Sequence, residues 1–154
     1  MGEEVQDQLV KLLESRKKTI SAFTVCWFGG EPLMAFSVVE RLSKKFIEVC
    51  EESDIAYNAS MITYGYLLTT DILGRMKGLK LSSLQVTVDG MKEVHDSRRT
   101  LADGGATFDR IMQNLRDGYD LMPPISLRVN VDKNNIGAGE GISGFYKSIT
   151  CLIR

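Results

Sequence analysis

The chain has 154 residues, a length that suits one domain. Hydrophobic residues make up 44% and charged residues 25%, which are ordinary globular values and argue against a disordered chain. With 19 basic and 20 acidic residues, the net charge of −1 gives no bulk field that would attract nucleic acid or an anionic membrane. We therefore expect no nucleic-acid partner.

Targeting and membrane signals are missing from the sequence. No apolar run approaches the ~18 residues of a membrane span, and the first ten residues are too acidic and polar for a signal peptide. These features predict a soluble, cytoplasmic protein with no membrane partner.

The three cysteines, Cys26, Cys50 and Cys151, are far apart and form no CxxC pair. A zinc site or an iron–sulfur cluster built from this chain alone would need closely spaced ligands, so we expect no metal ligands here. Cys26 and Cys50 lie in apolar runs, which favours buried, structural thiols.

Hydrophobic periodicity predicts alternating helices and strands. In chain order, it predicts helices over 3–18, 33–52, 69–76 and 107–119 and strands over 23–28, 55–63, 84–89 and 125–132. The run 23–28 is apolar on both faces, which indicates a strand buried on both sides. Residues 91–106 are expected to form a long loop, and Thr107 to cap the helix that follows. The alternation indicates an α/β fold with about four parallel strands and crossover helices.

Two of these strands alternate strictly between apolar and polar residues. The polar positions are Gln85, Thr87 and Asp89 in one strand and Ser126, Arg128, Asn130 and Asp132 in the other. One interpretation is an antiparallel sheet with a solvated face. The other is an open or barrel-like sheet whose inner face lines a ligand cavity, with the site at the strand C-termini.

The turn Gly29-Gly30-Glu31-Pro32 follows the first predicted strand directly. Glycines allow positive φ and close approach of the backbone to a ligand, and Glu31 adds a carboxylate. Such an acceptor-rich patch suits a ligand ammonium better than a phosphate, and neither GxGxxG nor GxxxxGK[ST] is present. Taken alone, this turn is more often structural than functional.

His95 is the only histidine, and it precedes Asp96, Arg98 and Arg99. Adjacent His and Asp residues do not face each other well, and no nucleophile is specified. We interpret this segment as an ion network that stabilises the loop.

Five stretches resemble, in order, the motifs of radical SAM enzymes. They are Trp27–Leu33 with GGEP, Ile62–Leu68 at a strand end, Gln85–Gly90, the run from Val94-His95-Asp96 through Arg99 to Gly104-Gly105-Ala106-Thr107-Phe108-Asp109, and Leu127–Asp132. The resemblance covers roughly residues 4–136. It is strongest to peptide- and protein-modifying maturases, including the anaerobic sulfatase-maturating (arylsulfatase-activating) enzymes and their SPASM-domain relatives.

The resemblance implies a partial (β/α)6 TIM-like barrel that binds S-adenosylmethionine. It implies that Gly29, Gly30 and Glu31 contact the methionyl amino group, with Pro32 shaping the turn. It also implies a cofactor-binding position at the strand end for Thr63, a position near the ribose for Thr87, and positions near the cofactor for Arg128 and Asn130.

The resemblance further implies that an intact parent holds a [4Fe–4S] cluster on a CxxxCxxC motif and generates a 5′-deoxyadenosyl radical. The parent would then abstract hydrogen from a peptide or protein substrate, for example in sulfatase maturation. This chain lacks that motif, a sixth strand and a cysteine-rich SPASM region, and Tyr64 replaces the usual Asn. We therefore expect a central fragment that is inactive alone.

Two other interpretations stay open: a non-catalytic binding or scaffold domain that keeps the half-barrel, and an ordinary nucleotide-binding α/β domain. For the domain organisation we expect a core over 1–136 and a glycine-rich, disordered tail over 137–154. The exposed edges of an incomplete parallel sheet also predict self-association.

Overall fold

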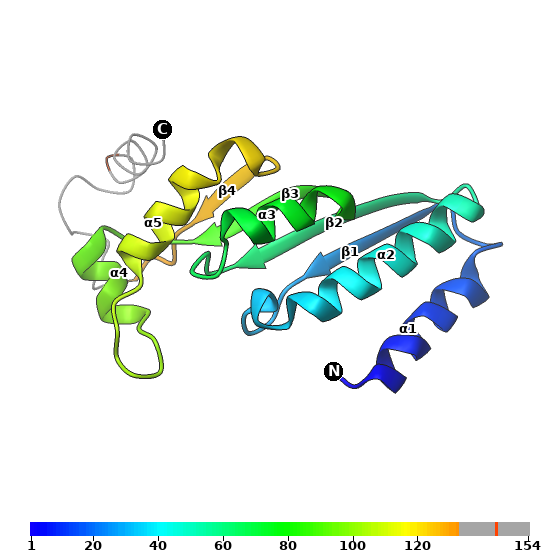
Figure 1. Ribbon diagram of the computed structural model, residues 1–154, viewed down its shortest axis with the longest axis horizontal. Coiled ribbons are helices and arrows are strands. Elements are labelled where there is room, and N and C mark those ends of the chain that lie inside the picture. Colours follow the sequence, from blue (N-terminus) through cyan, green and yellow to red (C-terminus); the bar gives the residue numbers. More distant parts are fainter. Residues whose placement is uncertain (133–143, 145–154) are drawn as a thin grey trace.

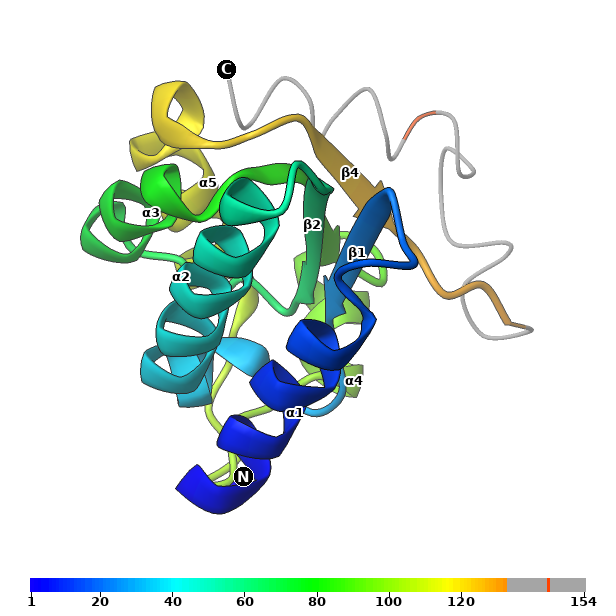
Figure 2. The ribbon, with the colours of Figure 1, turned by 90° about the vertical axis from the view of Figure 1, so that its right-hand side faces the viewer.

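A computed structural model describes residues 1–132 and Gly144. Its helices and strands, in chain order, are α1 (Glu3–Arg16), β1 (Ala22–Trp27), α2 (Phe36–Glu52), β2 (Ala56–Thr63), α3 (Thr70–Met76), β3 (Leu81–Thr87), α4 (Lys92–Arg98), α5 (Phe108–Asp117) and β4 (Ile125–Arg128). Strands and helices alternate along the chain, and the helices gather on one side of the sheet (Figures 1 and 2).

The four strands form one sheet in the order β1-β2-β3-β4, and each neighbouring pair is parallel. The predicted parallel α/β fold with crossover helices is therefore confirmed, and the antiparallel interpretation is wrong. Within the described residues the sheet is open, with β1 and β4 at its two edges. Because all strands run the same way, their carboxyl ends meet along one edge of the sheet.

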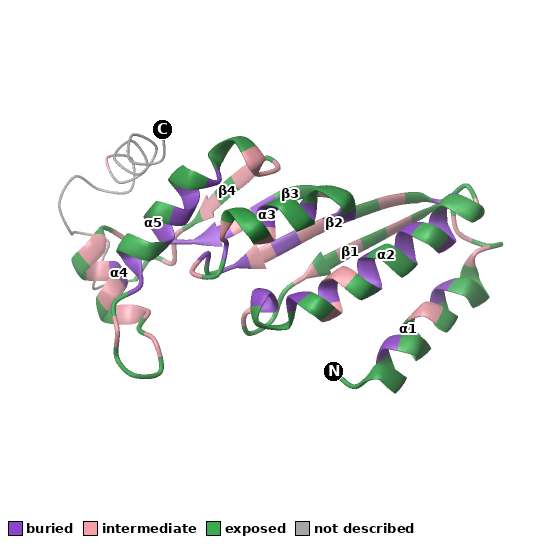
Figure 3. Ribbon diagram, in the orientation of Figure 1, coloured by how far each residue is buried: buried purple, intermediate pink, exposed green. Residues whose placement is uncertain are grey.

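The core lies between the sheet and the helices. One face of α2 is apolar and buried, and its Phe46 packs edge-on against Phe23 of β1 at 5.2 Å between ring centroids. Leu84 and Val86 of β3 are fully buried on the same side of the sheet. Figure 3 shows the buried residues concentrated on the facing sides of helices and sheet. Apolar burial between these two layers therefore stabilises the fold.

The opposite, inner side of the sheet has no covering layer in the described structure. In β1 every second residue is exposed, so the prediction of a strand buried on both sides is wrong. For the same reason Cys26 is exposed, against expectation, whereas Cys50 on α2 is fully buried as predicted. The apolar sequence of β1 could not reveal that one of its faces would stay open.

The expected long loop contains a helix, α4, so the prediction of a loop over 91–106 is wrong for Lys92–Arg98. Thr107 is the N-cap residue of the next helix, as predicted, but its side chain makes no capping hydrogen bond. Asp96 Oδ1 accepts hydrogen bonds from the backbone N–H groups of Thr107 (2.9 Å) and Phe108 (2.8 Å) at the start of α5. The Thr107 hydroxyl does not cap the helix; it donates to the carbonyl of Arg99 at 2.6 Å.

The last strand ends at Arg128 and not at residue 132. The predicted boundary at residue 136 and the tail over 137–154 lie outside the described residues, apart from Gly144.

In the part of the chain that the structure describes, every helix is too short or too polar to cross a bilayer.

Replacing the capping carboxylate should weaken the α4–α5 connection. We expect Asp96→Ala to lower the free energy of unfolding by about 1–2 kcal/mol, because two N–H groups at the start of α5 lose their acceptor. Urea unfolding monitored by circular dichroism measures this change. Asp120→Ala, at an exposed carboxylate that makes no hydrogen bond or ion pair with another described residue, is the matched control. Equal stability of the two variants would contradict the capping role.

Candidate functional site

The turn after β1 takes a backbone conformation that favours glycine. Gly29 has φ of 90° and Gly30 has φ of 56°, both in the left-handed region. A Cβ atom at either position would meet open space, so the backbone conformation and not crowding requires glycine here. Both residues are exposed, and their carbonyl oxygens accept no hydrogen bond from other described residues. The turn therefore presents open acceptors at the carboxyl edge of the sheet.

The Glu31 side chain ties this turn to the end of β2. Its carboxylate accepts hydrogen bonds from the Thr63 hydroxyl (2.7 Å), the Tyr64 backbone N–H (2.7 Å) and the Leu33 backbone N–H (3.0 Å). A carboxylate has about four acceptor positions, so three are already used within the protein. Pro32, which is buried, begins the 3₁₀ turn that follows. Glu31 therefore holds the shape of the turn, and the glycine carbonyls are its more accessible acceptors.

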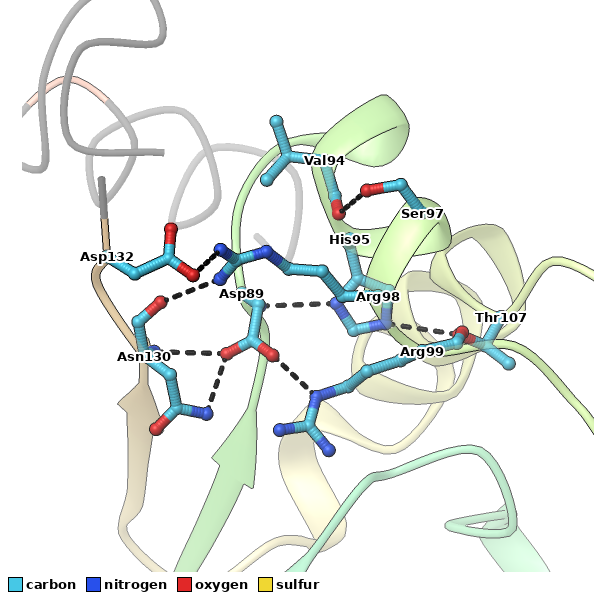
Figure 4. A network of polar contacts seen from close by, with 9 residues as sticks. All are labelled: Asp89, Val94, His95, Ser97, Arg98, Arg99, Thr107, Asn130 and Asp132. Atoms are coloured by element: carbon cyan, nitrogen blue, oxygen red, sulfur yellow. Dashed lines mark hydrogen bonds and ion pairs between the residues drawn. The ribbon is translucent and has the colours of Figure 1, made fainter. Parts of the chain in front are cut away.

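A second carboxylate, Asp89, joins the ends of β3 and β4 (Figure 4). Oδ1 of Asp89 accepts hydrogen bonds from the backbone N–H (3.0 Å) and the side-chain amide (2.9 Å) of Asn130, and Oδ2 accepts one from Arg99 Nε (2.7 Å). Burial alone would raise the pKa of Asp89, but the hydrogen bonds from Asn130 and Arg99 outweigh it and keep the pKa below its ordinary value. Asp89 is therefore ionised at neutral pH.

His95 is fully buried behind this carboxylate. Its Nδ1 accepts a hydrogen bond from the Asp89 backbone N–H at 3.2 Å, and its Nε2 lies 3.1 Å from the Thr107 hydroxyl. That hydroxyl already donates to the Arg99 carbonyl, so His95 donates through Nε2–H and is neutral. Burial lowers its pKa. The loop is therefore held by neutral hydrogen bonds around His95 as well as by the predicted ion pairs.

Arg99 places a charged group at the same edge of the sheet. Its Nε is bound to Asp89, and its guanidinium carbon lies 4.8 Å from the centre of the Tyr64 ring. The two terminal nitrogens make no hydrogen bond or ion pair with other described residues, and the side chain is 25% exposed. Arg99 therefore offers a fork of donors that suits a carboxylate. Arg98, by contrast, is engaged by the Asn130 carbonyl and the Asp132 carboxylate.

Several of the predicted site residues lie along one edge of the sheet. The Gly29–Pro32 turn contacts Thr63 directly, and Thr87 and Arg128 are register partners in β3 and β4. The chain of contacts Glu31–Tyr64–Arg99–Asp89–Asn130 connects the two halves. Thr87 is only 5% exposed, but its hydroxyl has no hydrogen-bond partner among the described residues.

Sequence reasoning missed Arg99 as a candidate ligand-binding residue and treated it as part of a loop network. The polar alternation of the strands does not point to Arg99, because this residue follows α4 and belongs to no strand. The only signal was its place after the His-Asp pair in the motif that resembles radical SAM enzymes. Among residues 1–132 and Gly144, no three His, Cys, Asp or Glu side chains come together as metal ligands.

Together, the fold and the site define an open, parallel α/β sheet with polar groups gathered at the carboxyl ends of its strands. No family model and no curated protein matches the chain. Solved structures do resemble it. Native anSMEcpe with bound AdoMet and Kp18Cys peptide has a TM-score of 0.82 and 19% identity, over 96% of this chain and 40% of that chain.

Two further structures of anSMEcpe agree. The AdoMet-bound form has a TM-score of 0.78, and the form with AdoMet and Cp18Cys peptide has one of 0.77, both at 18% identity and the same coverage. The name denotes an anaerobic sulfatase-maturating enzyme of the radical SAM type. At this identity the likeness shows the fold: the chain has a partial radical SAM fold and spans about two fifths of the length of anSMEcpe.

The buried neutral His95 should make stability depend on pH. Its pKa is lower in the folded chain than its ordinary value of 6.5, so the unfolded chain takes up the proton first. The stabilisation is complete above about pH 6.5 and is lost as the pH falls toward the folded pKa. We expect the free energy of unfolding to drop by about 1 kcal/mol between pH ~7.5 and ~5.5.

Urea unfolding at a series of pH values measures this dependence. His95→Gln is the comparison: it should be less stable at neutral pH but should show a flatter dependence over this interval, because the titrating group is gone. An unchanged slope in His95→Gln would show that His95 is not the group responsible.

Proposed function

We propose that this chain forms the S-adenosylmethionine-binding part of a peptide-modifying, maturase-like radical SAM protein. The observation that carries the proposal is a set of groups along one edge of the sheet that bind no other described residue. They are the carbonyls of Gly29 and Gly30 and the two terminal guanidinium nitrogens of Arg99. The fold shared with AdoMet-bound anSMEcpe supports it.

The groups match the chemistry of the methionyl end of the cofactor. An ammonium needs acceptors, which the glycine carbonyls provide with the one remaining acceptor position of Glu31. A carboxylate needs paired donors, which the Arg99 fork provides. Because Asp89 and the Tyr64 ring hold Arg99 in place, little side-chain entropy remains to be lost on binding.

The ribose is expected further along the inner side of β3 and β4. The Thr87 hydroxyl binds no other described residue, and its register partner Arg128 is exposed. A sugar hydroxyl can both donate and accept, which suits such neighbours. The Asn130 amide, in contrast, is already bound to Asp89, so we assign it the role of fixing the edge of the site.

The residues described do not fit a [4Fe–4S] cluster. Such a cluster is held by several thiolates, whereas Cys50 is buried in α2 and Cys26 lies on the open face of β1. In an intact parent, the cluster would supply the electron for reductive cleavage of S-adenosylmethionine. We therefore assign no step of that chemistry to residues of this chain, and we propose that the chain alone is catalytically inactive.

A peptide or protein is the substrate we propose for the intact parent. The structures named above include anSMEcpe with the Kp18Cys and Cp18Cys peptides bound. In this chain, the exposed inner face of the sheet begins at the same edge as the proposed cofactor site, which leaves room for a substrate next to it. Formylglycine formation in a sulfatase is one reaction of this kind.

Binding of S-adenosylmethionine should depend on Arg99. We expect Arg99→Gln to weaken binding at least tenfold, because a partly desolvated charged pair is worth about 1.5–3 kcal/mol. Isothermal titration calorimetry on the purified chain measures the dissociation constant. Arg110→Gln, at an exposed arginine of α5 without an ion partner among the described residues, is the matched control.

Two results would contradict the proposal: no binding by the unchanged chain up to millimolar cofactor, or equal affinity in Arg99→Gln. The first result would favour the alternative of a half-barrel scaffold that no longer binds the cofactor, and the second would remove Arg99 from the binding site.

Anaerobic reconstitution with iron and sulfide tests the proposed inactivity. We expect far less than one [4Fe–4S] cluster per chain, because three suitably placed thiolates are required. Visible absorbance with iron and sulfide analysis measures the cluster content, and an intact radical SAM enzyme treated in parallel is the positive control. A stoichiometric cluster in this chain would overturn the expectation.

A further inference from the structure

The Arg99 guanidinium is held by two contacts of different chemistry. Its Nε donates to Asp89 Oδ2 at 2.7 Å, and its central carbon lies 4.8 Å from the centre of the Tyr64 ring. A single hydrogen bond fixes a distance, but the guanidinium can still pivot about it. The ring restricts that pivot, and contact with an aromatic ring uses none of the N–H donors. The two contacts together therefore orient the guanidinium and leave its terminal nitrogens able to bind a carboxylate.

The backbone that carries the Tyr64 ring is fixed on the side of β1 and β2. The Tyr64 N–H donates to Glu31 Oε2 at 2.7 Å, and the N–H of the next residue, Gly65, donates to the Thr63 hydroxyl at 3.0 Å. That hydroxyl donates in turn to Glu31 Oε1 at 2.7 Å. The turn over residues 63–65 is therefore bonded as one unit to the Glu31 carboxylate.

Asn114 of α5 holds the same turn from the side of the helices. Its side chain is buried, and Nδ2 donates to the carbonyls of Gly65 (2.9 Å) and Tyr66 (2.8 Å). A buried polar group that loses its partner is costly, so this double contact strongly favours one position of the turn. The place of Tyr64 relative to α5 therefore depends on Asn114.

The segment that carries Arg99 is bonded to the start of the same helix. The Thr107 hydroxyl donates to the Arg99 carbonyl at 2.6 Å. Asp96, three residues before Arg99, accepts hydrogen bonds from the first backbone N–H groups of α5. One rigid helix thus holds both the turn of the tyrosine and the segment of the arginine, and it sets the distance between them.

We propose that Tyr64 and Asn114 are positioning residues for the carboxylate of the ligand. Tyr64 orients the Arg99 guanidinium through its ring, and Asn114 places that ring by fixing the turn against α5. Both act through Arg99. The part of this inference that concerns the ligand rests on the proposed function, whereas the ordering of Arg99 in the free chain does not.

The order of the Arg99 side chain is measured without any ligand. Nitrogen relaxation NMR gives an order parameter for each arginine Nε–H, and the Arg99 signal is the one that disappears in Arg99→Gln. We expect an ordered Nε–H in the unchanged chain and in Tyr64→Phe, which keeps the ring. The order parameter should fall in Tyr64→Leu and in Asn114→Leu.

Tyr119→Leu is the matched control, because Tyr119 is exposed to a similar extent as Tyr64 (46% against 40%). It should leave the Arg99 signal unchanged, and circular dichroism verifies that each variant is folded. An Arg99 order parameter that stays the same in Tyr64→Leu would overturn the proposal, whether or not the chain binds S-adenosylmethionine. The same result in Asn114→Leu alone would remove Asn114 from it.

A matched pair of ligands tests whether this positioning serves the carboxylate. By calorimetry, Tyr64→Leu should raise the dissociation constant of S-adenosylmethionine at least about threefold, as expected for the loss of a cation–π contact. Decarboxylated S-adenosylmethionine lacks the group that Arg99 binds, so its dissociation constant should change less than about twofold. Tyr64→Phe should bind both ligands as the unchanged chain does.

Equal losses for the two ligands in Tyr64→Leu would show that the tyrosine does not act through Arg99, and would overturn the proposal. A different result, in which the unchanged chain binds neither ligand, would contradict the proposed function. The relaxation measurement then still decides whether Tyr64 orients Arg99.

Discussion

The buried carboxylate of Asp89 is the interaction on which most of the candidate site depends. It is 3% exposed and accepts hydrogen bonds from Asn130 and Arg99. These bonds fix the end of β4 against the end of β3 and hold the guanidinium on the Tyr64 ring. Replacing such a carboxylate would leave the arginine without its partner in a half-buried position, which is costly. The neutral His95 supports the same carboxylate from behind by accepting the Asp89 backbone N–H.

Glu31 and Asp89, the two carboxylates at the carboxyl edge of the sheet, each hold neighbouring strand ends together. Glu31 fixes the turn after β1 to β2, as Asp89 fixes β3 to β4, and the stacking of Arg99 on Tyr64 connects the two pairs. Sequence reasoning treats a carboxylate after a buried strand as a direct ligand acceptor. In this structure most of the acceptor capacity of Glu31 is used internally. The groups left for a ligand are backbone carbonyls and guanidinium nitrogens, which residue identity alone does not reveal.

The sequence predicted the parts of the fold that follow from local periodicity. The parallel sheet followed from the alternation of strands and helices, and the polar inner face followed from residues such as Thr87 and Arg128. Features that depend on distant contacts were missed. The exposure of Cys26 depends on whether another layer covers the inner face, and the cap of α5 by Asp96 depends on α4, a helix of seven residues too short to give a clear period.

The two faces of the sheet differ in what they can contact. Leu84 and Val86 of β3 are fully buried under the helices, so apolar burial stabilises that face. The inner face carries polar side chains such as Thr87 and Arg128, so its exposure to water has a small free-energy cost. The same alternation along β3 and β4 therefore builds the core on one face and leaves polar groups for the proposed ligand on the other.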